Sequence, residues 1–85
     1  MNTDNINKHV PLLTQLVQTT IHHAKQQRSD TSIGKQQHWV SEQLQTIIPH
    51  ITDYAAIVQI IVGAPAPAST PDEAIDQLVQ WGFSS

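Results

Sequence analysis

One stretch of sequence decides the fold, residues 33–62, which read IGKQQHWVSEQLQTIIPHITDYAAIVQIIV. Apolar side chains recur in it at heptad spacing, in two interleaved sets. The first set is Ile33, Val40, Ile47, Tyr54 and Ile61, and the second is Leu44, Ile51 and Val58. We call these positions the apolar seam, and Gln37 is their one polar interruption. Heptad spacing keeps one stripe of a helix against the same neighbour, inside a bundle or between chains. The stretch therefore predicts a long second helix in an all-α fold.

Pro49 stands near the middle of the seam. A proline inside a helix has no N–H to donate and its ring clashes with the preceding turn, at a cost of about 3 kcal/mol. The helix can therefore end at about Ile48 and restart at about His50, or it can continue with a kink. Because the heptad register runs through Pro49 without a phase shift, the pattern favours the kink.

The N-terminal half predicts a first helix from about Val10 to about Gln27. Pro11 suits its first turn, where the missing N–H would have no partner in any case. Apolar residues at spacings of three and four form a stripe along this helix, and Leu12 and Leu16 widen it. The stripe consists of Ile6, Val10, Leu13, Val17, Ile21 and Ala24. This pattern is typical of a helix that packs one face against a core.

We expect a single domain, because 85 residues bury only a limited core. It consists of a flexible N-terminus (1–8), a helical core (9–63), an Ala/Pro linker (64–70) and a C-terminal helix with its tail (71–85). Within the core, the polar run 29–32 predicts a turn and a helix start. The expected fold is a small antiparallel bundle of three to four helices.

The start of the C-terminal helix is well marked. Gly63 should end the preceding helix, and the alternating prolines of the linker favour an extended, stiff connector. Thr70 then acts as the N-cap, Pro71 takes the first helical position and Glu73 reaches back as in a capping box.

The same helix should end at about Trp81, with Gly82 as a left-handed stop and Phe83 against Leu78. About eleven residues are too few to be helical alone in water. The helix must therefore dock, onto its own chain or onto another molecule. The residues expected to make that contact are Ala74, Ile75, Leu78, Val79 and Trp81.

The charge argues against nucleic-acid binding. The formal net charge is −3 and only four basic residues are present: Lys8, Lys25, Arg28 and Lys35. Residues 1–41 hold these four and two acids, which gives +2, and residues 42–85 hold five acids and no base, which gives −5. Phosphate binding requires clustered Lys and Arg. The charge difference between the halves is able to orient two copies antiparallel or to steer a partner.

Nothing in the chain predicts catalysis or a cofactor. There is no cysteine, and the histidines do not recur at the spacings that place two ligands on one helix face. No stretch reaches the roughly 18–20 apolar residues of a membrane helix. We expect a non-enzymatic protein without metal or cofactor, located in the cytoplasm.

Beyond Pro49 the apolar residues spread around the helix, because Ile57, Ile60 and Val62 flank the seam. A short chain has little material to cover such a segment. This favours a helical protein–protein interaction or regulatory protein, a homodimer that assembles along the seam from Ile33 to Ile61. The expected interface residues are Val40, Leu44, Ile47, Ile51, Tyr54, Val58, Ile61, Leu78, Trp81 and Phe83.

Two alternatives remain open. In size, lack of cysteine and helix pattern the chain is similar to the bacteriocin immunity proteins of Gram-positive bacteria, which are small antiparallel helical bundles of the cytosol. That resemblance implies an immunity or antitoxin-like protein whose C-terminal helix recognises a partner. A small metal-binding or enzymatic protein is the other alternative, and no ligand or catalytic pattern supports it.

Overall fold

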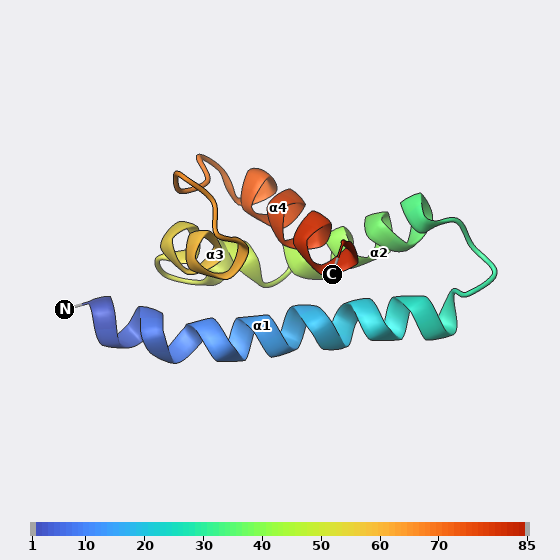
Figure 1. The fold of residues 1–85 in the computed structure, drawn as a ribbon, viewed down its shortest axis with the longest axis horizontal. Helices are drawn as coiled ribbons and strands as arrows, with labels where there is room; N and C mark the ends of the chain where they lie inside the picture. The colour runs from blue at the N-terminus through green and yellow to red at the C-terminus, as the bar shows by residue number, and fades with distance from the viewer. Residues whose placement is uncertain (1, 85) are drawn as a thin grey trace.

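The computed structural model describes residues 2–84 and contains four α-helices in this range. They are α1 (Asn2–Gln27), α2 (Ile33–Gln45), α3 (Tyr54–Val62) and α4 (Pro71–Phe83), with a short 3₁₀ helix, η1 (Ile48–His50), between α2 and α3. α1 runs along one side of the molecule, α2 returns antiparallel to it, and α3 and α4 complete a second layer over α1 (Figure 1). The predicted all-α antiparallel bundle is confirmed.

The first helix is longer than the sequence predicted. α1 begins at Asn2, so the expected start near Val10 was wrong, and Pro11 lies inside the helix instead of in its first turn. Residues 2–8 of the expected flexible N-terminus are therefore helical here, and residue 1 lies outside the described range. Ile6 and Val10 pack against the core. Their burial offsets the hydrogen bond that Pro11 cannot make.

The second helix breaks near Pro49, and of the two expected alternatives the chain adopts the break. α2 ends at Gln45. The amides of Thr46 and Ile47 then bond three residues back, to the carbonyls of Gln43 and Leu44, at 3.3 and 3.0 Å. Hydrogen bonds to the third residue back continue into η1. Pro49 lies near the start of this short helix, where its missing N–H needs no partner. The unbroken heptad spacing favoured a continuous, kinked helix, and this expectation was wrong. The chain changes direction near Pro49 although apolar residues keep the same spacing on both sides.

Asp53 completes the break. Its backbone has a left-handed conformation, with φ 62° and ψ 28°, immediately before α3 starts. In Figure 1, α3 is seen almost end-on beside α1, so the two helices cross. This reorientation brings Ile48 and Ile57, which lie outside the seam, into full burial. Conversely, Ile33 at the first seam position is 56% exposed, because it lies at the end of the molecule where α2 begins.

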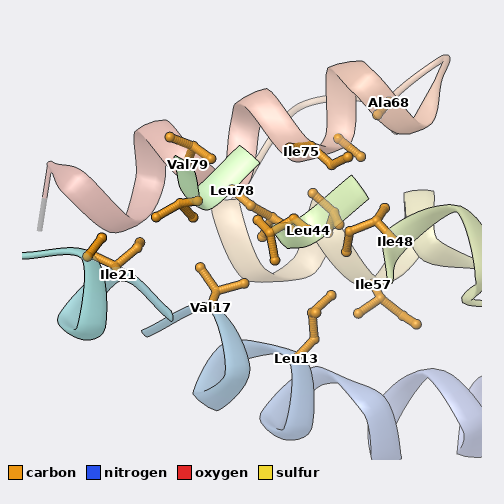
Figure 2. Close-up of a cluster of buried hydrophobic side chains, with 14 residues drawn as sticks. Leu13, Val17, Ile21, Leu44, Ile48, Ile57, Ala68, Ile75, Leu78 and Val79 are labelled. Atoms are coloured by element: carbon orange, nitrogen blue, oxygen red, sulfur yellow. The ribbon is translucent and has the colours of Figure 1, made fainter. Parts of the chain in front are cut away.

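The core lies between α1 and the layer formed by the other helices. Leu13, Val17 and Ile21 point from α1 toward that layer (Figure 2). Leu44 and Leu78, from α2 and α4, are fully buried opposite them. α4 therefore docks on its own chain.

The helix starts follow the sequence prediction. The Thr70 hydroxyl accepts a hydrogen bond from the Glu73 amide at 3.1 Å, and the Glu73 carboxylate accepts one from the Ser69 amide at 3.0 Å. Ser32 caps α2 by accepting from the Lys35 amide at 3.3 Å. These contacts confirm the predicted cap at Thr70 and the helix start after the polar run.

The helix ends follow the sequence prediction only in part. Gly63 has φ 72° and ends α3 as predicted. Gly82 is different, because α4 continues through it to Phe83 and ends at Ser84 in a right-handed conformation. The expected left-handed stop at Gly82 was therefore wrong. This glycine instead allows α4 to approach the Ile21 side chain of α1.

Candidate interaction surface

The structure divides the ten expected interface residues into two groups. Four of them have no exposed surface and belong to the core of the chain itself: Val40, Leu44, Val58 and Leu78. The other six are partly exposed: Ile47, Ile51, Tyr54, Ile61, Trp81 and Phe83. The centre of the seam is therefore an intramolecular contact, and only its margins reach the surface.

The C-terminal helix is part of the same core. Ala74, Ile75 and Val79 are buried along with Leu78. The linker is anchored as well, because Ala68 is 7% exposed. The solvent side of α4 carries Asp72, Glu73 and Asp76, which are exposed.

Three large apolar side chains are more than half exposed in the described part of the chain. They are Leu12 on α1, Ile33 at the start of α2 and Ile60 on α3. The sequence placed Leu12 on the packing stripe, but the structure leaves it outside the contact between α1 and the second layer. Single exposed apolar side chains are common on protein surfaces.

The outer face of α2 carries an ordered polar row. Lys35, His38, Glu42 and Gln45 are all exposed and follow each other at intervals of three, four and three residues. We call these four residues the α2 stripe. Residues at such intervals lie on one side of a helix, so the row extends along most of α2. Sequence reasoning missed the stripe because it followed only the apolar positions.

Two contacts set the charge at the C-terminal end of the stripe. His38 Nε2 lies 3.3 Å from Glu42 Oε1, an ion pair when the histidine is protonated. Gln45 Nε2 donates to Asp72 Oδ1 at 3.5 Å, which brings an acid of α4 beside the last residue of the stripe. The stripe thus changes from basic at Lys35 to acidic at Glu42, and Asp72 of α4 adds a second acid beside its C-terminal end.

Trp39 borders the stripe. It lies four residues after Lys35 and three before Glu42, so its indole is adjacent to both on the helix surface. The side chain is half-buried, and the Arg28 guanidinium lies 5.1 Å from its ring centroid. A cation at this distance over an indole is an attractive contact. It holds one face of the ring against Arg28, in the turn that joins α1 to α2.

That turn is fixed by a buried amide. Gln36 is 4% exposed, and its Nε2 donates to the carbonyls of Arg28, at 3.0 Å, and Thr31, at 3.3 Å. Its Oε1 is buried without a partner. The start of α2 is therefore held in a defined position relative to the end of α1.

The described residues 2–84 show no pocket and no group of three side chains able to hold a metal ion. His9 makes its contact within its own helix, with Nδ1 2.7 Å from the Asn5 carbonyl oxygen. Nor does any helix in this range have the length and apolar character needed to cross a membrane. The surface features above are therefore what the fold offers to a partner.

Comparisons with known proteins give no relative: no protein-family model, curated protein or solved structure matches the chain.

Proposed function

We propose that this protein is a non-enzymatic helical interaction protein. It acts by associating with another protein molecule, and the partner that we propose is a second copy of itself. The observation that supports the proposal is the exposure of Leu12, Ile33 and Ile60, between 55 and 57% on three different helices. Tyr54 of the seam and Trp81 of α4 are also partly exposed. Burial of such side chains drives protein association.

The association is an addition to a fold that is complete within one chain. The accessible surface is 5265 Å², close to the roughly 5,000 Å² of a compact monomer of this mass. The centre of α3 is covered by the chain itself, since Ile57 and Val58 have no exposed surface. We therefore expect a reversible dimer of folded protomers and not an obligate dimer.

Sedimentation equilibrium tests the proposal directly. The full chain should show a monomer–dimer equilibrium with a dissociation constant in the micromolar range, as expected for a small contact between folded proteins. Replacement of Ile60 by Ser should leave the fold intact, because the side chain is exposed. A weaker dimer in this variant would place α3 in the contact, and unchanged dimerisation would place the contact elsewhere on the fold. A wild-type chain that stays monomeric up to hundreds of micromolar would contradict self-association.

The immunity or antitoxin-like alternative is supported by one observation, the exposed acids of α4. Asp72, Glu73 and Asp76 face solvent on the C-terminal helix, which suits a basic partner. The idea of a helix held away from the body on a stiff linker finds no support in the structure, because α4 packs in the core. The double variant Glu73→Gln/Asp76→Asn should then lose binding to a cationic peptide such as oligolysine. Its thermal midpoint should fall only slightly, because glutamine keeps an oxygen that can accept from the Ser69 amide. Unchanged peptide binding would count against this candidate.

A further inference from the structure

The α2 stripe is complementary to itself when reversed. Its intervals of three, four and three residues are symmetric, so a second α2 lying antiparallel meets it residue for residue. In that register Lys35 lies opposite Gln45 of the other copy, and His38 lies opposite Glu42. Because Asp72 touches Gln45, Lys35 also approaches an acid. Lys35 thus meets the acid that lies beside Gln45, and His38 meets a carboxylate with which it pairs when it is protonated.

We propose that the outer face of α2 is the contact surface for a second copy of this chain, with the two α2 helices antiparallel about a two-fold axis. The inference rests on the self-association proposed above and places the contact on the α2 stripe and Trp39, apart from the exposed side chains of Leu12, Ile33 and Ile60. A two-fold contact uses the same patch on both protomers, and a self-complementary patch is what such symmetry requires. An acidic or basic foreign partner would match only one end of the stripe.

Trp39 flanks the middle of this contact. In the antiparallel register the axis passes at the level of residue 40, so Trp39 of each protomer lies at the side of the stripe, close to the axis along the helix. Aromatic side chains are enriched in protein interfaces. The Arg28 guanidinium and the buried Gln36 amide already hold this part of α2 in place. Little ordering is then needed when the two faces meet.

The size of the contact sets its strength. α2 has 13 residues and is therefore about 20 Å long. One helix face of this length falls short of the roughly 800 Å² per partner that typical stable complexes bury. Charge complementarity contributes orientation more than affinity. The dimer is accordingly weak, and its dissociation constant rises with salt because the charges of the stripe are exposed.

Two charge variants test the register without harming the helix. Lys35→Glu puts an acid in the first turn of α2, and Gln45→Lys puts a base in its last turn, so both agree with the helix dipole. Each variant alone creates two like-charge contacts in the symmetric dimer. The dissociation constant measured by sedimentation equilibrium at low salt should rise about three- to tenfold in each case. Gln43→Lys, an exposed site on α2 outside the stripe, is the control and should change little.

The deciding measurement is an equimolar mixture of the two variants. In the heterodimer the acid introduced by Lys35→Glu in one protomer lies opposite the base introduced by Gln45→Lys in the other. The second contact keeps its native pair, so the mixture should regain an affinity close to that of the wild type. If the wild type dimerises but either variant has no effect, or if the mixture fails to recover, the α2 contact is wrong while self-association stands. A monomeric wild type overturns both proposals.

Discussion

Gly82 of α4 lies directly against Ile21 of α1, so close that a Cβ on residue 82 would overlap Ile21 Cδ1. Gly82→Ala should therefore fail to raise the free energy of unfolding as Gly→Ala usually does inside a helix. The terminal methyl of Ile21 has to turn away, and the cost of this shift in a buried contact offsets the gain of up to about 1 kcal/mol that Ala brings to a helix. Urea unfolding followed by circular dichroism measures the change.

Gly34→Ala is the matched control for this variant. Its Cβ would lie 4.0 Å from its nearest neighbour, Ser32 Oγ, so the substitution finds space. It should stabilise the protein by about 0.5–1 kcal/mol. Ile21→Val removes the obstructing methyl group, so the double variant Ile21→Val/Gly82→Ala should be more stable than the sum of the single changes predicts. Additive effects would show that the two residues do not meet.

The seam gives the second prediction. Leu44→Ala should cost about 2–5 kcal/mol, because a fully buried leucine leaves a cavity behind. Leu12→Ala, the same chemical change at a side chain that is 57% exposed, should stay within about 0.5 kcal/mol. Unfolding at several protein concentrations separates folding from association. A Leu44→Ala variant that keeps wild-type stability and loses only dimerisation would make the seam an intermolecular contact.

The sequence was sufficient for some parts of the fold, for physical reasons. Local signals such as the hydroxyl of Thr70 and the carboxylate of Glu73 act within one helical turn, so their effect could be read without the rest of the chain. The buried positions of α1 followed from their spacing, since Leu13 and Val17 face the core as predicted.

Where several elements decide the outcome together, the sequence was not sufficient. The heptad pattern continues across Pro49, but the chain turns there with the help of a left-handed Asp53, which no apolar spacing reveals. Gly82 has the composition of a helix stop, and its position against Ile21 depends on how α4 crosses α1. The acid that accompanies Gln45 at the end of the α2 stripe is Asp72 of α4, and only the fold brings these two residues together. These are tertiary relationships between residues far apart in the chain.

Gln36 provides the third prediction. Gln36→Leu removes two hydrogen bonds to carbonyls at the corner between α1 and α2, and it should destabilise the protein by about 1–3 kcal/mol. Gln36→Glu should cost more, because it places a carboxylate against the carbonyls of Arg28 and Thr31 in place of a donor. Gln37→Leu, at the half-buried neighbour, is the control. Equal stability of the Leu and Glu variants would contradict the donor role of the amide.

Asp53 provides the last prediction. Its left-handed backbone, with φ 62°, suits Gly and Asn better than other residues, and its Oδ2 is buried without a hydrogen-bond partner. Asp53→Ala should therefore lower stability by about 1 kcal/mol, because alanine has neither the freedom of glycine nor a local polar group. Asp53→Asn keeps the backbone preference and removes a charge from a half-buried site, so its thermal midpoint should equal or exceed that of the wild type. Gly63→Ala places alanine at another left-handed position, with φ 72°, so its thermal midpoint should fall like that of Asp53→Ala. An Asn variant as unstable as the Ala variant would show that the carboxylate itself holds the turn between η1 and α3.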